Sequence, residues 1–169
     1  MEPLKLNLGS GPRGLPGYRS VDLYDLEADQ RVDLRVLPWP WADSSVDAVA
    51  MLHILEHFPN PEEVAMEVWR ILKPGGEWQV EVPHAHGAVS PSFYHVRSFA
   101  HSAFHSILCG QKPYRFEGRR LFRETYYHVT LPFRWLRPLE GLASRHADGW
   151  EMTGLFPPLS MEWRGVALK

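Results

Sequence analysis

The sequence predicts a single α/β domain built around a mostly parallel sheet. Its 169 residues, with 44% apolar and 22% charged side chains, have the size and balance of one ordinary soluble domain. A strand pattern, a helix pattern and a second strand pattern follow one another in the middle of the chain, an order that favours parallel pairing. The 15 prolines and 13 glycines indicate short elements joined by shaped loops.

Three short runs predict the first strands. Residues 5–8 are largely apolar and stop at Gly9-Ser10-Gly11, as a buried strand that enters a tight turn would. Residues 18–23 form a second candidate strand with an acid, Asp22, near its end. The apolar run 47–52 predicts a third buried strand.

The clearest predicted helix begins after Asn60, which can cap it. Pro61 suits the first helical position, and Glu63 completes a capping box. Apolar residues then recur at helical spacing as far as Leu72. We expect the segment 73–76, Lys-Pro-Gly-Gly, to end the helix with a glycine cap, and the alternating residues 77–82 to form the next strand.

After Pro83 the pattern is weaker. It predicts a helix over residues 98–108, a strand over 121–129, a helix over 133–144 that breaks near Pro138, and a last strand over 160–168.

Charge divides the chain into two halves. Residues 1–85 hold 7 Lys/Arg against 14 Asp/Glu, a balance of −7, whereas residues 86–169 hold 11 against 6, a balance of +5. Without a linker or repeat between them, we interpret the halves as two faces of one domain. The acidic start and the short apolar runs predict no signal peptide and no membrane span, and hence a cytoplasmic protein. The single cysteine, Cys109, excludes an internal disulfide.

The glycine turn matches G-x-G-x-x-G over residues 9–14, which is typical of dinucleotide sites. Such a site needs a full helix after the glycines and an acid about 20 residues on. Here Asp22 follows Gly11 by 11 residues, and the connection contains two prolines and two further glycines. The spacing therefore favours a ligand that has a ribose but no pyrophosphate, with the Asp22 carboxylate accepting the ribose hydroxyls.

Several segments, in this order, resemble the class I S-adenosylmethionine-dependent methyltransferases, and among them small bacterial methyltransferase-like proteins. The resemblance covers residues 5–84 and, beyond them, only residues 94–99. It rests on segments 6–11 (the first motif), 16–22 (a proline-glycine link into an acid-ended strand), 33–34, 37–47, 53–58 (a leucine-glutamate-histidine signature) and 72–76.

The resemblance implies a Rossmann-like twisted sheet with an antiparallel last strand, and S-adenosylmethionine as cofactor. It implies that Asp22 holds the ribose and that Asp33 reaches the adenine amino group. Residues 1–85 would be the cofactor-binding half and residues 86–169 the acceptor side. The implied cofactor-binding residues are Asn7, Leu8, Gly9, Ser10, Gly11, Asp22, Leu23, Asp33, Leu34, Leu52 and His53.

Histidines are the candidates for proton transfer and for metal binding. The sulfonium is already activated, so a base is needed only where the acceptor loses a proton. Motif order places His53, His84 and His95 near the carboxyl edge of the sheet. His101 and His105, spaced by four with Cys109 beyond them, share a helix face, but no closed ligand set is present and we predict no metal site.

The implied function is methyl transfer to a small-molecule or carbohydrate-like acceptor. Four arginines close together, at positions 115, 119, 120 and 123, suit an anionic acceptor if they face the cleft; otherwise they are a solvated basic edge. The slightly acidic chain does not favour nucleic acid. Two other classes stay open: a non-catalytic binding module with this fold, and a nicotinamide-dependent oxidoreductase.

Two further alternatives concern single motifs. Trp39 and Trp41 pack at the edge of the core or form a lid over the adenine. Glu56 and His57 orient neighbouring backbone or contact the ligand directly.

Overall fold

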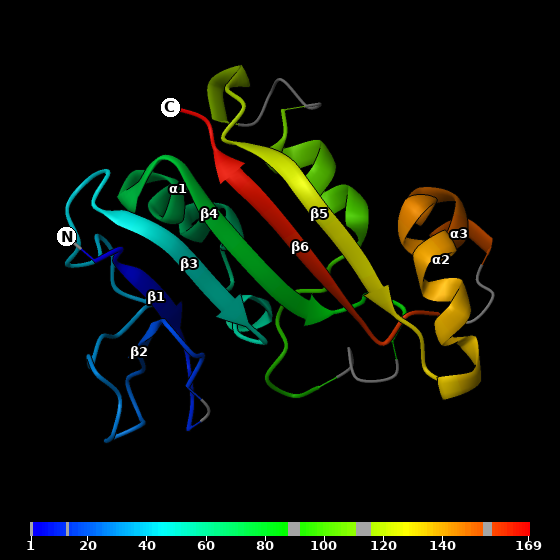
Figure 1. Ribbon diagram of the computed structural model, residues 1–169, viewed down its shortest axis with the longest axis horizontal. Helices are drawn as coiled ribbons and strands as arrows, with labels where there is room; N and C mark the ends of the chain where they lie inside the picture. Colours follow the sequence, from blue (N-terminus) through cyan, green and yellow to red (C-terminus); the bar gives the residue numbers. More distant parts are fainter. Residues whose placement is uncertain (1, 13, 88–91, 111–115, 154–156) are drawn as a thin grey trace.

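A computed structural model describes residues 2–12, 14–87, 92–110, 116–153 and 157–169. Its centre is one six-stranded sheet in the order β2-β1-β3-β4-β6-β5 (Figure 1). The strands are β1 (Lys5–Leu8), β2 (Arg19–Val21), β3 (Val46–Leu52), β4 (Leu72–Pro83), β5 (Phe122–Thr130) and β6 (Ser160–Ala167).

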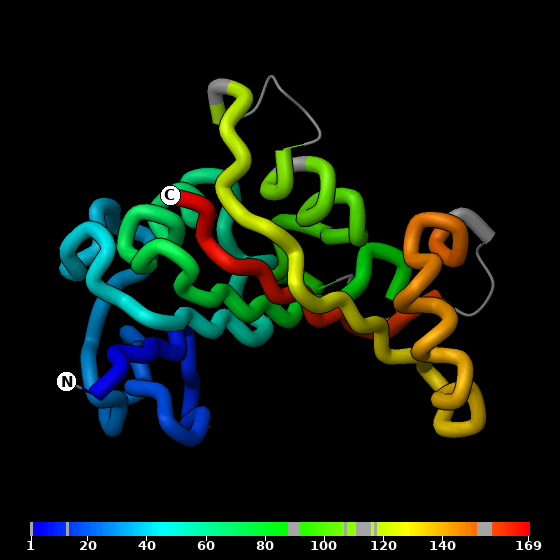
Figure 2. Tube along the Cα trace, turned by 45° about the horizontal axis from the view of Figure 1, so that its top comes forward, coloured from blue at the N-terminus to red at the C-terminus, as the bar shows by residue number. Residues whose placement is uncertain are grey.

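Strand directions agree with the predicted fold class. Strands β1 to β4 pair in parallel, and β6 runs antiparallel to both of its neighbours, β4 and β5. The last strand in the chain therefore lies inside the sheet, between β4 and β5, and Figure 2 shows its red tube between the green and the yellow one. The α/β fold with an antiparallel last strand is confirmed.

The helices are short. They comprise η1 (Leu55–His57), α1 (Pro61–Ile71), the π-helix η2 (Ala103–Leu108), η3 (Phe116–Gly118), η4 (Arg134–Leu139), α2 (Glu140–Arg145) and α3 (Ala147–Thr153). The predicted helix over residues 133–144 is present as η4 followed by α2, with Pro138 inside the 3-10 segment. Every helix among the described residues is too short or too polar to cross a bilayer.

Helix α1 begins at Pro61 as predicted, but its N-cap and its C-terminal end differ from the prediction. The Asn60 side chain does not cap the helix; its Nδ2 instead donates to Glu63 Oε1 at 3.4 Å. The helix ends at Ile71, because Leu72 is extended and already pairs with Val46. Gly75, with φ of +75°, shapes the irregular start of β4 instead of capping α1.

One face of the sheet is covered by helices over β4 and β6. Trp78, Val80 and Val82 are buried, whereas the alternating Glu77 and Gln79 stay partly exposed on the opposite face. In Figure 1 the strands of this open face lie in front of α1 and η2. The uncovered half of the sheet is therefore polar, in contrast to a parallel sheet buried on both faces.

Aromatic side chains fill the covered side. The Trp78 and Trp163 rings are 5.9 Å apart, and Phe104 from η2 stacks on Trp163 at 5.4 Å. Trp39 and Trp41 are buried and meet edge to face at 6.1 Å. These two residues pack at the edge of the core and do not form a lid.

Candidate functional site

The glycine turn after β1 has a backbone that only glycine suits. Gly9 has φ of +69°, and a Cβ built there would lie 2.5 Å from Ile54 Cγ1. Gly11 also has positive φ, at +53°. Between residues 9 and 45 the described chain forms turns and β2 without a helix, so the short connection leads directly to Asp22 as the spacing indicates.

Asp22 lies at the end of β2 and connects two loops. Its Oδ2 accepts the Gly11 backbone N–H at 2.9 Å, and its Oδ1 accepts those of Tyr24 at 2.8 Å and Asp25 at 3.1 Å. Partial burial opposes ionisation, but the backbone N–H groups of Gly11, Tyr24 and Asp25 outweigh it and lower the pKa of Asp22. The carboxylate is therefore ionised and fixed beside the glycine turn.

A pocket of about 240 Å³ opens next to this carboxylate. It is lined by Gly9, Asp22, Leu23, Tyr24, Val32, Asp33, Leu34, Arg35, Ile54, His57 and Phe58. Five of the residues implied by the resemblance, at positions 9, 22, 23, 33 and 34, line it together. The others, Asn7, Leu8, Ser10, Gly11, Leu52 and His53, lie outside its wall.

Sequence reasoning did not find Tyr24, Val32, Arg35, Ile54 and Phe58 as pocket residues. They come from loops whose path no periodic pattern reports. Only Ile54 and Phe58 carried a signal, since they flank the leucine-glutamate-histidine segment.

Asp33 is paired with Arg35 at the rim of the pocket. Arg35 Nε lies 2.8 Å from Asp33 Oδ1 and Arg35 Nη2 lies 2.7 Å from Asp33 Oδ2. The Arg35 side chain and backbone hydrogen bonds lower the pKa of Asp33 to about 2. An adenine amino group that reached Asp33 would share this carboxylate with the guanidinium.

The pocket suits the adenosyl part of S-adenosylmethionine. Apolar side chains meet in it with two carboxylates, Asp22 directly after β2 and Asp33 from a loop, a combination that matches an adenine ring beside a ribose. Asn7 Oδ1 and Ser10 Oγ are also buried and make no hydrogen bond to a described residue. Such atoms next to Gly9 are what a polar group of a bound cofactor would satisfy.

A cluster of imidazoles and carboxylates lies at the carboxyl ends of β3 and β4. His53, with a strained φ of +54°, has Nε2 3.3 Å from Glu81 Oε1 and Nδ1 3.8 Å from Glu56 Oε1. His95 Nε2 lies 3.9 Å from the same Glu56 oxygen. Hydrogen bonding to Glu56 and Glu81 raises the pKa of His53 to about 9, so its imidazole is protonated at neutral pH.

Glu56 and His57 hold the segment around Tyr94. The Glu56 carbonyl accepts the backbone N–H groups of Val96 and Arg97, and His57 Nδ1 lies 2.9 Å from the Tyr94 carbonyl oxygen. Glu56 is 1% exposed, and its Oε2 has no partner among the described residues. Both residues thus orient backbone, while His57 also lines the pocket.

His84 is fully buried, and both of its ring nitrogens are occupied. Its Nδ1 accepts the His86 backbone N–H at 3.2 Å, and its Nε2 lies 2.8 Å from Glu151 Oε1. An imidazole held in this way orients α3 against β4 and has no nitrogen left for an acceptor. The His53 ring also lies between two carboxylates, but its side chain is 50% exposed and that of His95 is 16% exposed. Because an acceptor can reach these two rings and not the fully buried His84, the geometry favours His53 and His95 as bases.

The arginines do not face the pocket. Arg119, Arg120 and Arg123 are exposed around the start of β5, and Arg115 lies outside the described residues. Because β5 runs in the direction of β4, its start lies at the amino edge of the sheet, opposite the edge that carries His53. Their clustering in sequence thus gives no support to an anionic acceptor.

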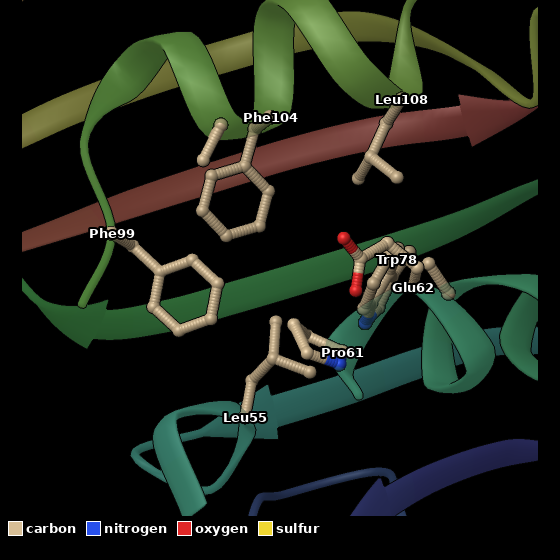
Figure 3. A pocket seen from close by; sticks show the side chains of 9 residues that line it. Leu55, Pro61, Glu62, Trp78, Phe99, Phe104 and Leu108 are labelled. Carbon is tan, nitrogen blue, oxygen red and sulfur yellow. The ribbon is translucent and has the colours of Figure 1, made fainter. Parts of the chain in front are cut away.

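A second, smaller hollow lies between α1 and η2 over Trp78 (Figure 3). It measures about 50 Å³, and the side chains that point into it are mostly apolar, among them Leu55, Phe99, Phe104 and Leu108. With a single carboxylate, Glu62, at its rim, it is a packing gap under η2 and not a cofactor site.

Comparison with known proteins gives one family match and many structures of the same fold. Residues 24–79 match the family model described as a methyltransferase domain. A comparison with curated protein sequences gives no match.

Solved structures share the fold at low sequence identity. A SAM-dependent methyltransferase from Archaeoglobus fulgidus is 13% identical, with a TM-score of 0.67, covering 97% of this chain and 86% of that chain. Phosphoethanolamine N-methyltransferase 2 from Haemonchus contortus, in complex with phosphomonomethylethanolamine and S-adenosylhomocysteine, is 14% identical, with a TM-score of 0.61. The match covers 100% of this chain and 50% of that chain. A SAM-dependent methyltransferase from Mesorhizobium loti is 14% identical, with a TM-score of 0.54, covering 98% of this chain and 91% of that chain.

Fold and pocket together define a Rossmann-like protein of the class that binds S-adenosylmethionine at the carboxyl edge of its sheet. The family match shows a methyltransferase-domain segment over residues 24–79, and this segment lies in a fold that the chain shares with S-adenosylmethionine-dependent methyltransferases of solved structure. The chain is an enzyme of that type, and S-adenosylmethionine is its cofactor.

Proposed function

We propose that this methyltransferase acts on a hydroxyl or amine group of a small-molecule or carbohydrate-like acceptor. The observation that carries the proposal is the position of the pocket around Asp22 beside the cluster of His53, Glu56, Glu81 and His95. In this arrangement residues 1–85 form the cofactor-binding half and residues 86–169 the acceptor side of one domain. A cytoplasmic location is part of the same proposal.

Within the cofactor half, Asp22 accepts the ribose hydroxyls and Asp33 accepts the adenine amino group. Val32, Leu34 and Phe58 are the apolar side chains of the pocket that would hold the adenine ring. The remaining residues, Asn7, Leu8, Gly9, Ser10, Gly11, Leu23, Leu52 and His53, shape the path from the ribose toward the sulfonium end. The bound cofactor supplies a methyl group already activated on a sulfonium.

Proton transfer falls to His53 and His95. A neutral imidazole nitrogen of one of these residues would accept the proton that the acceptor oxygen or nitrogen loses when it is methylated. Glu56, buried between them, stabilises the imidazolium that results. Because the raised pKa of His53 keeps it protonated at neutral pH, proton transfer to His53 becomes faster in alkaline solution.

The nicotinamide-dependent alternative has little support, because the described connection between β1 and β2 offers no helix N-terminus for a pyrophosphate. A non-catalytic binding module would bind the cofactor in the same pocket but would transfer no methyl group.

Calorimetry and turnover test these alternatives. We expect binding of S-adenosylmethionine and S-adenosylhomocysteine, and none of NAD or NADP. Release of S-adenosylhomocysteine is then measured with a panel of sugars, amines and phenols, with Glu56→Gln as the catalytic variant. The proposal is supported if the parent methylates at least one acceptor and if the Glu56→Gln variant methylates it more slowly while binding the cofactor with the same affinity. Cofactor binding without turnover on the whole panel favours the binding module, and NAD binding overturns the proposal.

A further inference from the structure

Two histidines, one just before and one within η2, lie beside a glutamate of β5. Strand β5 is the edge strand at the opposite end of the sheet from β2. His101 Nε2 lies 3.4 Å from Glu124 Oε2, and His105 Nδ1 lies 3.5 Å from the same oxygen. Possible ligand atoms of the three residues all lie within 4.8 Å of one another. Their side chains are 12%, 35% and 22% exposed, so the cluster is half-buried.

We propose that His101, His105 and Glu124 form a binding site for a divalent transition metal of the zinc type. A tetrahedral ion with bonds of about 2.0–2.2 Å holds its ligand atoms about 3.3–3.6 Å apart. The two measured nitrogen–oxygen separations fall in this range. They also exceed the 2.7–3.2 Å of a good N–H···O hydrogen bond, so direct hydrogen bonding explains the arrangement less well.

The surroundings of the cluster have the form of a metal site's outer shell. His101 Nδ1 lies 3.0 Å from Asp148 Oδ1, which leaves Nε2 directed toward Glu124, as in carboxylate–histidine–metal arrangements. Glu124 Oε2 is itself fixed by the Trp163 indole N–H at 2.8 Å. The ligand His101 and the carboxylate that orients it, Asp148 of α3, thus come from different elements of the fold. Chance clustering of polar residues on one helix would not bring them together.

Local backbone structure supports the same assignment. His101 precedes and His105 lies within η2, a π-helix, which is rare in proteins and frequent at functional sites. The two imidazole rings stack with centroids 5.1 Å apart. Phe104 packs on Trp163, so η2 is fixed against the sheet.

Three protein ligands leave one coordination position of the ion free. His101 and Glu124 also line an open pocket of about 370 Å³, together with Tyr127, Ser144 and Asp148. Water or a small anionic ligand can therefore reach the ion from solvent. The ion would connect η2 to β5 in the acceptor-side half of the chain.

The test uses the full chain, first dialysed against EDTA and then titrated with zinc chloride by calorimetry. Co²⁺, which reports tetrahedral nitrogen and oxygen ligands by its visible absorption, serves as a second probe. We expect one equivalent of Zn²⁺ to bind, a rise in Tm on its addition, and a loss of affinity of a hundredfold or more in His105→Gln and in Glu124→Gln. Asp148→Asn should weaken binding by about 10- to 100-fold, as outer-shell changes do.

Two controls separate this site from other histidines. His128→Gln changes a histidine of the same strand outside the cluster and should bind Zn²⁺ like the parent. His57→Gln removes the second group of possible ligands, formed by Glu56, His57 and His95. Zn²⁺ binding that is lost in His57→Gln and kept in His105→Gln overturns the proposal, as does absence of binding by the parent chain. Circular dichroism before titration shows that each variant is folded.

Discussion

The carboxylate of Asp22 accepts the backbone N–H of Gly11 at 2.9 Å, across the turn that joins β1 to β2. The same side chain holds the loop after β2 through Tyr24 and Asp25. One acid at the end of a three-residue strand thus fixes both loops that border the pocket. The described residues between these strands form no helix, and this contact replaces the support that a crossover helix would give.

Asp22→Ala should weaken binding of S-adenosylhomocysteine by about ten- to a hundredfold, because it removes charge-assisted hydrogen bonds of roughly 1.5–3 kcal/mol. Calorimetry measures the affinity. Asp29→Ala is the matched control, since Asp29 is an acid of the same loop that bonds to Ser20 outside the pocket. Equal affinity of the parent and Asp22→Ala would disprove the ribose assignment.

Gly9→Ala should both destabilise the protein and reduce cofactor affinity. The new Cβ would lie 2.5 Å from Ile54 Cγ1 at a φ of +69°, and a residue forced into this region costs of order 1–3 kcal/mol. Thermal unfolding and calorimetry measure the two effects. Gly14→Ala has no atom within 4 Å of the new Cβ and should leave both unchanged. Parent-like stability of Gly9→Ala would show that the turn is less constrained than its geometry indicates.

His53 should titrate near pH 9 in the free protein, as followed by the NMR shifts of its ring protons. Glu81→Gln removes one of its two carboxylates and should move the midpoint down toward the ordinary 6.5. A parent midpoint near 6.5 would contradict the geometry of the cluster.

The same shift predicts how stability depends on pH. Since folding raises the pKa of His53, its contribution to the free energy of unfolding is fully present below pH 6.5. It is lost as pH rises through about 9. The difference in stability between the parent and His53→Gln should therefore shrink between pH 7 and pH 10, as measured by urea unfolding. A constant difference over this range would exclude the linkage.

Glu67→Ala should lower the free energy of unfolding by about 3 kcal/mol, because it leaves a buried network without its acceptor. Glu67 Oε1 accepts the Trp39 backbone N–H at 2.6 Å and lies 2.6 Å from Arg70 Nη2. Urea unfolding measures the loss. Glu63→Ala, on the exposed first turn of the same helix, is the control and should change stability by less than about 0.5 kcal/mol. Similar losses in the two variants would mean that the Glu67 network contributes nothing specific.

Local sequence patterns predicted the strands of the sheet and the glycine turn and acid that border the pocket, whereas the antiparallel last strand was implied only by the resemblance. The predicted strands and turn follow from local signals: the apolar runs that end at Gly9 and Asp22, and the break between residues 73 and 76. The strand predicted from residue 77 begins instead at Leu72, because pairing of Leu72 with Val46 is a tertiary contact that overrides the glycine signal.

Which charged side chains share a site became clear from the arrangement of the strands and helices in space. Glu124 lies 19 residues after His105 in the chain, and no spacing rule predicts that β5 brings it beside η2. The direction of β5 places Arg119 and Arg120 at the edge opposite the pocket, which favours the solvated basic edge over the cleft, the two alternatives that the sequence left open. Local patterns report backbone conformation and burial, whereas contacts between distant residues depend on strand order and register, which the chain fixes only when its sheet is assembled.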